Sequence, residues 1–235
     1  MRQQLLHGYV LHQRPYRENS RLVQYFCMEA GRVDGVARQS LPALYQPSLL
    51  YATGKTSLKA FARIEPVGSP VLVSGAGLLA GFYLNELLVR LLPVEEAYPA
   101  LFASYASSLA GLQQLQGGQN STALRALLRR FEWALLDTLG ALPDFVQDAL
   151  GQPIDPAQSY RYVAGQGLLH AANGALPGAQ LLQVSANALH AQVPTAEVLQ
   201  LTAQVFRQEI ARQLGDRPLH SRELWRQMSL QSRQE

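Results

Sequence analysis

The chain has 235 residues, of which 48% are hydrophobic and only 16% are charged, so it has enough apolar material for one large or two modest globular domains and does not resemble a disordered protein. The single cysteine, Cys27, excludes an internal disulfide and a multi-cysteine zinc site, and we expect it to be a buried small apolar residue. Residues 71–92 are the most apolar stretch but contain Asn85, Glu86 and Arg90. They therefore predict a core helix, and with no signal-peptide pattern we expect a cytoplasmic protein without membrane contact.

Positive charge is concentrated at the start of the chain. Residues 1–70 carry nine Lys and Arg against four Asp and Glu, whereas residues 71–235 carry eleven against thirteen. A basic first part fits binding to the phosphate backbone of a nucleic acid. Statistical scatter would explain the same imbalance, and charge alone does not choose between the two.

Five short apolar runs lie between residues 7 and 65, separated by turn-forming or polar residues. They are rich in Val, Leu, Tyr and Phe, a pattern typical of β-strands. The predicted strands are residues 7–14, 20–27, 32–38, 47–53 and 58–65. Strands this short and this close together predict a small barrel. The OB-fold, which often binds single strands, is the favoured form, and an SH3-like barrel would leave much the same pattern.

After residue 70 the apolar residues recur every three or four positions, which predicts helices. The expected helices cover residues 78–92, 95–116, 121–139, 178–190, 195–214 and 222–229. Between them, residues 141–177 are irregular, apart from a short hairpin expected over 159–170. The predicted fold class is therefore α+β, with a barrel domain at residues 1–70 and a helical domain at residues 71–235.

No constellation typical of catalysis is present. The glycines of the segment Gly75–Gly81 miss the dinucleotide-loop spacing and stand in a helical context, so we expect them to serve helix packing. The five histidines are scattered and no pair has metal-ligand spacing. We therefore expect no metal, no cofactor and no enzymatic activity.

Basic residues of the predicted barrel are the candidates for contacts to DNA. Single-strand binders combine a positive groove with aromatic side chains on which bases stack, and tyrosines are interleaved with the basic residues here. The candidates are Arg14, Arg17, Arg32, Arg38, Lys55 and Lys59. The alternative is that the arginines only make the barrel soluble and that the aromatics fill its core, and for Tyr9, Tyr25 and Phe61 we favour the core.

A second basic group lies on the helix predicted over 121–139. Arg125 and Arg129 are four residues apart and share a face, and Arg130 is next to them. Apolar neighbours and an arginine rim would suit an acidic peptide with an aromatic tip. The alternative is a solvated helix face, with Arg129 or Arg130 paired to Glu132 or Glu86.

Three blocks of sequence, taken together, resemble the RecO family of bacterial recombination mediators. They are GYVLHQRPYRENSRLVQYFCMEAGRVDGVAR (8–38), GFYLNELLVRLL (81–92) with LRRFEWALLDTLG (128–140), and RPLHSRELWRQM (217–228). The resemblance spans nearly the whole chain, and no single block carries it alone.

The resemblance implies an OB-fold followed by a helical domain, and a DNA-repair function in the RecF pathway. It implies binding to single- and double-stranded DNA, strand annealing, and assistance to RecA on strands coated with single-strand-binding protein (SSB). The implied partners are RecR and the acidic, Phe-ended C-terminal tail of SSB, the latter held by Arg129 and Arg130 with Arg125 nearby. It also implies association with the nucleoid.

Two features depart from the family pattern. Residues 141–177 contain no cysteine, so a metal-free loop replaces the four-cysteine zinc module of some members. Many relatives also carry a Lys- and Arg-rich loop after the third strand, whereas residues 39–46 here are short and uncharged. Fewer phosphate contacts predict weaker DNA binding with a shallower salt dependence.

Overall fold

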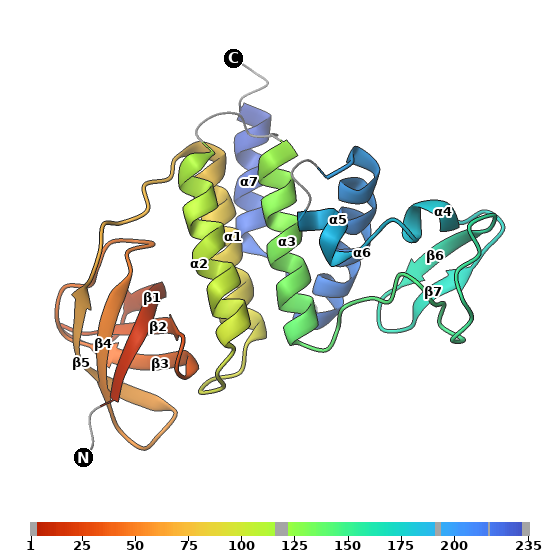
Figure 1. The fold of residues 1–235 in the computed structure, drawn as a ribbon. Coiled ribbons are helices and arrows are strands. Elements are labelled where there is room, and N and C mark those ends of the chain that lie inside the picture. Colours follow the sequence, from red (N-terminus) through yellow and green to blue (C-terminus); the bar gives the residue numbers. More distant parts are fainter. Residues whose placement is uncertain (1–3, 116–121, 191–193, 216, 232–235) are drawn as a thin grey trace. The chain divides into compact units, whose positions relative to one another are not determined.

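A computed structural model describes residues 4–115, 122–190, 194–215 and 217–231 (Figure 1). The chain forms two compact units, one comprising Met1–Gln119 with Leu219–Glu235 and the other Asn120–Pro218. The change from strands to helices predicted near residue 70 falls inside the first unit. Three helices, one of them from the far end of the chain, belong to the same unit as the strands.

The strands of the first unit form a closed barrel of the OB-like type. They are β1 (Gln4–Pro15), β2 (Arg21–Cys27), β3 (Gly31–Ala37), β4 (Ser48–Thr53) and β5 (Leu58–Pro66). Their order is β1-β2-β3-β5-β4, with β1 paired to β4 to close the barrel and β3 parallel to β5. All five predicted strands are present.

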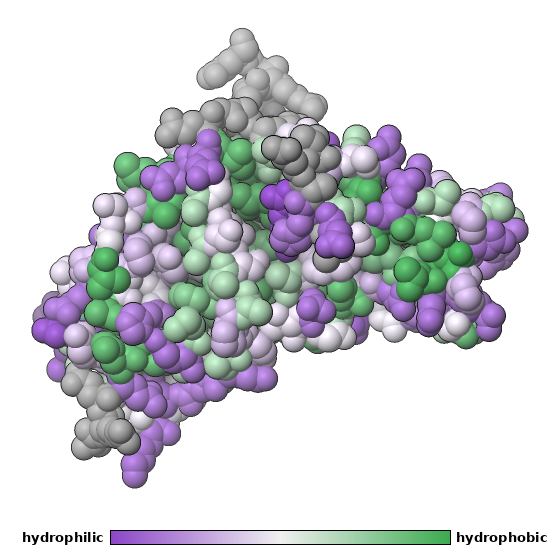
Figure 2. Space-filling view, viewed as in Figure 1, coloured by the Kyte–Doolittle hydropathy of each residue, from purple (hydrophilic) through white to green (hydrophobic). Residues whose placement is uncertain are grey.

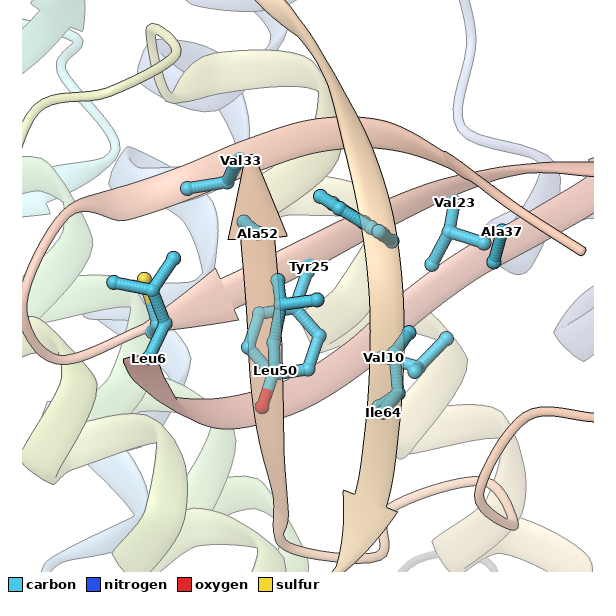
Figure 3. Packing of buried hydrophobic residues seen from close by; sticks show 11 residues of the cluster. Leu6, Val10, Val23, Tyr25, Val33, Ala37, Leu50, Ala52 and Ile64 are labelled. Carbon is cyan, nitrogen blue, oxygen red and sulfur yellow. The ribbon is translucent and has the colours of Figure 1, made fainter. Parts of the chain in front are cut away.

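The barrel interior is filled by alternate residues of every strand. The cluster comprises Leu6, Val10, Val23, Tyr25, Cys27, Val33, Ala37, Leu50, Ala52, Phe61 and Ile64 (Figure 3). Successive side chains of a strand point to opposite faces, so the residues between these face outward. The Tyr25 hydroxyl is satisfied inside by donating to the Ser48 carbonyl at 2.7 Å. Burial raises the pKa of the Cys27 thiol to about 12, so this cysteine is an apolar core residue, as predicted.

Helices of the first unit cover one side of the barrel. They are α1 (Gly75–Leu91), α2 (Pro99–Gln114) and α7 (His220–Gln231). The outward-facing Tyr9 and Phe26 pack against Phe102 and Tyr105 of α2, with ring centroids 5.5–6.0 Å apart. Tyr25 and Phe61 are core residues of the barrel, as expected, while Tyr9 lies outside the core and is half-buried against a helix.

One buried polar contact joins β1 to α1 and α2. The ladder of β1 and β2 shifts register between Val10 and His12, at Leu11. Asn85 of α1 donates its amide to the Leu11 carbonyl at 2.9 Å and accepts from the Tyr105 hydroxyl at 2.6 Å. The Leu11 carbonyl, at the irregular point of β1, therefore has a hydrogen-bond partner in a helix side chain.

Glu86 joins α7 to α1. Its carboxylate accepts from the His220 and Ser221 N–H groups, both at 2.9 Å, and from the Ser221 hydroxyl at 2.6 Å. Burial alone would raise the pKa of Glu86, but these hydrogen bonds outweigh it and hold the pKa below its ordinary value. A carboxylate from one helix thus caps the start of another that lies more than 130 residues later in the chain.

The second unit combines helices with a small sheet. Its helices are α3 (Thr122–Thr138), α4 (Gly178–Leu181), α5 (Ala186–His190) and α6 (Ala196–Leu214). The hairpin predicted over 159–170 is confirmed as β6 (Ser159–Val163) and β7 (Gly167–His170), and β8 (Leu176–Pro177) pairs with β6. The single helix predicted over 178–190 is wrong: the Ser185 hydroxyl accepts from the Ala188 N–H and starts a separate helix.

A buried carboxylate connects the hairpin to α6. Glu209 accepts from the Tyr162 hydroxyl at 2.7 Å, from the Gly165 N–H at 3.1 Å and from Arg212. Among the described residues, no group of three or more His, Cys, Asp or Glu side chains is placed to hold a metal, and no helix is long and apolar enough to span a membrane.

One glycine of the segment Gly75–Gly81, Gly81, packs closely against Tyr45 of the 39–46 segment, and this contact can be tested by two matched substitutions. A Cβ on Gly81 would lie 2.4 Å from the Tyr45 hydroxyl oxygen, whereas a Cβ on Gly77 meets its neighbours at an ordinary 3.7 Å. We expect Gly77→Ala to stabilise the protein by about 0.5–1 kcal/mol because alanine favours the helix. Gly81→Ala should destabilise it by about 1–3 kcal/mol through overpacking.

Urea unfolding of both variants checks this prediction. Adding Tyr45→Phe to Gly81→Ala removes the nearest atom and should restore part of the loss. Similar effects at the two glycines would contradict the packing interpretation.

The Glu86 cap predicts a pH-dependent contribution to stability. Glu86→Gln should lower the free energy of unfolding at pH 7 by about 0.5–2 kcal/mol, the usual range for a lost helix cap. Because the folded-state pKa of Glu86 is lowered, its contribution is complete above the unfolded pKa of about 4.3 and is lost as pH falls through the folded value.

The measurement is urea unfolding of wild type and Glu86→Gln between pH 7 and pH 3, with Glu18→Gln, an exposed turn residue, as the control. The difference should shrink with acidification. A difference that stays constant over this range would contradict the role of the ionised carboxylate.

Candidate nucleic-acid and peptide interfaces

Strand register brings five arginines to one end of the barrel, which we call the arginine end. Arg21 of β2 pairs with Pro15 and with Ala37, so the residues Arg14 and Arg38 lie beside it on the neighbouring strands. Ala37 pairs with Phe61 in the parallel ladder, which brings the end of β3 next to the last part of β5. The arginine end comprises Arg14, Arg17, Arg21, Arg38 and Arg63, all exposed.

Two aromatic side chains accompany these arginines. The guanidinium carbon of Arg17, in the β1–β2 turn, lies 5.3 Å from the centre of the Tyr16 ring. That of Arg63 lies 4.4 Å from the centre of the Tyr51 ring. Two carboxylates are nearby: Glu65 pairs with Arg63 at 3.2 Å, and Glu18 is in the same turn as Arg17. Arginines exceed carboxylates here, so this end of the barrel favours an anionic ligand.

Two of the residues predicted to contact DNA, Arg32 and Lys59, are bonded to partners within the protein. Arg32 donates to the Val89 carbonyl at the end of α1 and pairs with Asp34 at 3.3 Å, and its side chain is 16% exposed. Lys59 is 8% exposed and forms an ion pair with Glu95. Both cations are balanced by a carboxylate in the folded protein, so they offer less to a phosphate than the arginine end does.

Lys55 stands apart from both groups. It is exposed in the turn between β4 and β5, which the register places beside the first half of β3 through the Asp34–Leu58 pairing. Of the six predicted DNA contacts, the structure therefore gathers Arg14, Arg17 and Arg38 at the arginine end and leaves the other three elsewhere.

The uncharged segment at residues 39–46 has a structural role. The Gln39 amide, oriented to satisfy both groups, donates to the Ala62 carbonyl at 3.2 Å and accepts from the Ile64 N–H at 2.7 Å. Leu41 packs against the barrel core and Tyr45 is buried against Gly81 of α1. The segment packs against the barrel core and α1, and it adds no charge to the surface.

The three arginines of α3 have different surroundings. Arg129 donates to Glu132 at 2.6 Å, and Glu132 is only 1% exposed. This is the pairing that the alternative interpretation expected. Arg130 donates through Nε to the Leu189 carbonyl at the end of α5 at 2.6 Å, whereas Arg125 is exposed. Removing Arg129 would leave a buried carboxylate without this cation.

A cavity of about 520 Å³ begins one turn beyond these arginines. Trp133 lines it, together with the apolar Phe145, Val146 and Val184. It also contains the carboxylates of Asp137 and Asp144. An aromatic side chain fits this lining, but its charge does not favour an acidic peptide, so capture of such a peptide would depend on Arg125 and Arg130, which lie earlier on α3 and do not line the cavity.

Another cavity, of about 340 Å³, lies in the first unit between β1, β2, α1 and α7. Its apolar lining includes Leu11, Phe82, Val89 and Leu224. Glu86 and His220 also line it and are bonded to each other as described above. The cavity marks the seam along which α7 packs.

The sequence predictions did not select two residues of the arginine end, Arg21 and Arg63. They also did not select Tyr51, which lies beside Arg63. The β-alternation of Leu50, Tyr51 and Ala52 was a signal that Tyr51 faces outward. No local signal places Arg21 beside Arg38, because the residues are brought together only by the pairing of β2 with β3.

Comparison with known proteins gives matches over nearly the whole chain. Residues 1–69 match the family model of the recombination protein O N terminal and residues 74–223 that of the recombination protein O C terminal. The DNA repair protein RecO of Stutzerimonas stutzeri is 41% identical, covering 93% of this chain and 92% of that protein. Those of Pseudomonas aeruginosa and Haemophilus influenzae are 39% and 35% identical, covering 92% and 97% of this chain and 92% and 98% of the relatives.

Proposed function

The chain belongs to the recombination protein O family of DNA repair proteins, and from this premise we propose that it is a non-enzymatic mediator that binds single- and double-stranded DNA and promotes annealing of complementary strands. By the same proposal it assists RecA on strands coated with SSB, acting with RecR in the RecF pathway. The observation that carries the proposal is the gathering of five exposed arginines at one end of an OB-like barrel.

The arginine end supplies the contacts that a strand requires. Arginine donates to phosphate in a planar fork, and Arg14, Arg21 and Arg38 lie at neighbouring positions on three adjacent strands, a group that we call the arginine row. This row reads no base edges, which suits a protein that holds DNA of any sequence. Single and double strands share the phosphate backbone, so both are expected ligands.

The geometry also explains why DNA would be directed to this end. OB-folds commonly bind oligonucleotides on the face of strands 2 and 3. Here Phe26 and Arg32 on that face are covered by α2 and bonded to α1. The β1–β2 turn, which in other OB-folds also contacts the ligand, remains open and carries Arg17.

The arginine end predicts a measurable loss of phosphate contacts on mutation. Arg14→Ala and Arg38→Ala should each weaken binding and reduce the slope of log affinity against log salt by about one. The measurement is fluorescence anisotropy of labelled single-stranded and duplex oligonucleotides over a salt titration. Arg161→Ala, an exposed arginine on β6, is the charge-matched control and should leave the slope unchanged.

Three outcomes bear on the proposal. Wild-type binding at low salt with smaller slopes in both variants supports it. Equal slopes in the variants and in wild type would move the interface away from this end. No DNA binding at low salt, with or without partners, would refute DNA binding and favour the second candidate function.

That second candidate is a protein-interaction adaptor with little DNA affinity of its own. The uncharged segment 39–46 favours it, as does the exposed Arg125 on the same helix that supplies Trp133 to a cavity with an aromatic lining. In this function the helical part would hold the acidic, Phe-ended tail of SSB, and partners would supply the contact with DNA.

The adaptor predicts that Arg125→Ala and Arg130→Ala each weaken binding of a synthetic acidic peptide ending in Phe by roughly tenfold or more, the loss expected for a charged hydrogen bond. Arg207→Ala, exposed on α6, is the control. Arg129→Ala should instead destabilise the fold in urea, because Glu132 loses its cation. Unchanged peptide binding in the Arg125 and Arg130 variants would contradict this groove assignment.

A further inference from the structure

Side chains of β1, β4 and β5 that point away from the barrel core form a further row, in which Leu5 and Arg63 are exposed and Tyr51 is half-buried. Leu50 and Ala52 point into the barrel, so Tyr51 between them points out. In the strand register Tyr51 lies opposite Leu5 of β1 on one side and opposite Arg63 of β5 on the other. Leu5 is 47% exposed and the Arg63 side chain 55%. One apolar, one aromatic and one cationic group thus stand side by side across three strands.

This row lies on the side of the barrel that the helices leave open. Helix α2 of the first unit packs on Tyr9 of β1, which is half-buried, and on Phe26 of β2, which is buried. Figure 1 shows β4 and β5 on the side of the barrel away from α1 and α2. The part of the barrel surface seen in Figure 2 mixes hydrophilic and hydrophobic residues, unlike the continuous apolar patch of a permanent protein interface.

Arg63 has partners that orient it without neutralising the site. Its guanidinium carbon lies 4.4 Å from the centre of the Tyr51 ring. Its ion pair with Glu65, at 3.2 Å, is solvent-exposed on both sides, and such pairs contribute little. The guanidinium can therefore exchange Glu65 for a phosphate oxygen while keeping its contact with the ring.

The row is continuous with the arginine end. Arg38 follows Ala37, which pairs with Phe61, and Gln39 is bonded to the backbone on both sides of Arg63. A strand held by Arg38 and its neighbours therefore meets Arg63 and then Tyr51 as it continues across the barrel.

We propose that Tyr51 and Arg63, with Leu5 beside them, form a base-stacking platform for single-stranded nucleic acid. A base lying against this pair gains stacking on the ring or on the guanidinium plane, and the guanidinium N–H groups bond the adjacent phosphate. Bases in a duplex are stacked on each other and cannot lie flat on the platform. The platform therefore makes the barrel prefer single strands, whereas the arginine row holds both forms. The inference rests on the proposed DNA binding and assigns a separate role within it.

The test compares variants of the full-length protein by anisotropy on a labelled oligothymidylate and on a duplex of equal length. Tyr51→Ala should weaken single-strand binding between about five- and a hundredfold, the range for loss of one stacked base, with duplex binding unchanged. Tyr51→Phe keeps the ring and should bind both as wild type does. Arg63→Lys keeps the charge but loses the plane, so it should lose single-strand affinity without a change in salt slope.

A direct measurement accompanies the variants in case Tyr51→Ala unfolds. An oligonucleotide with 5-iodouracil bases, irradiated with the wild-type protein, should crosslink to Tyr51, as identified by mass spectrometry of the adduct. Equal losses on single strands and duplex in Tyr51→Ala, or crosslinks confined to other residues, would overturn the platform.

The outcomes also separate the platform from the function on which it rests. If Arg14→Ala and Arg38→Ala lose DNA affinity while Tyr51→Ala binds single strands normally, the platform is wrong and DNA binding at the arginine end stands. If wild type binds neither oligonucleotide at low salt, the proposed function fails first.

Discussion

The contact between Asn85 and the Leu11 carbonyl is the constraint on which the arrangement of the first unit depends. It joins an irregular point in β1 to α1, and through the Tyr105 hydroxyl to α2. All three groups are buried, so an unpaired member would cost about 1–3 kcal/mol. Because each donor and acceptor has one geometry, the contact sets which side of the barrel faces the helices. The rings of Tyr9 and Phe26 then pack against Tyr105 on that side.

This choice of side distributes the basic residues into two classes. Cations such as Arg32 and Lys59 are largely buried and are paired with Asp34 and Glu95. Cations at the end of the strands and on the open side stay in water. The net charge of the first 70 residues therefore describes the open surface poorly until the internal pairs are subtracted. What remains is concentrated at the arginine end, where it produces a directed field rather than a diffuse one.

The sequence predicts the elements of this protein well because their signals are local. Short runs rich in Val, Leu, Tyr and Phe between turn-forming residues indicated all five strands, and a three-to-four spacing indicated the long helices. The helix predicted over 178–190 also failed for a local reason. Ser185 caps a new helix inside an apolar run whose spacing indicates a single helix. The RecO resemblance, supported by the family models and the relatives, gave the order of the two parts.

The candidate site was less accessible to prediction because its contacts join distant segments. The residues next to Arg32 in the sequence do not indicate that its guanidinium will donate to the Val89 carbonyl. Those next to Glu86 do not indicate a helix that starts at His220. Arg129 is the instructive exception, since Glu132 is three residues away and the pairing was foreseen. Basic residues could therefore be nominated from the sequence, but register and packing decide which of them face solvent.

Under the proposed function, the type of contact matters more than its number. Annealing requires that a bound strand keep its Watson–Crick edges free to meet a complementary strand. The arginine row bonds phosphates, and a stacking platform touches the face of a base, so neither uses those edges. Once pairing begins, the bases leave the platform to stack in the duplex, and only the phosphate contacts remain. A barrel with a modest set of arginines and an uncharged 39–46 segment then holds the product less tightly than the single strand, so the product can leave without any covalent step.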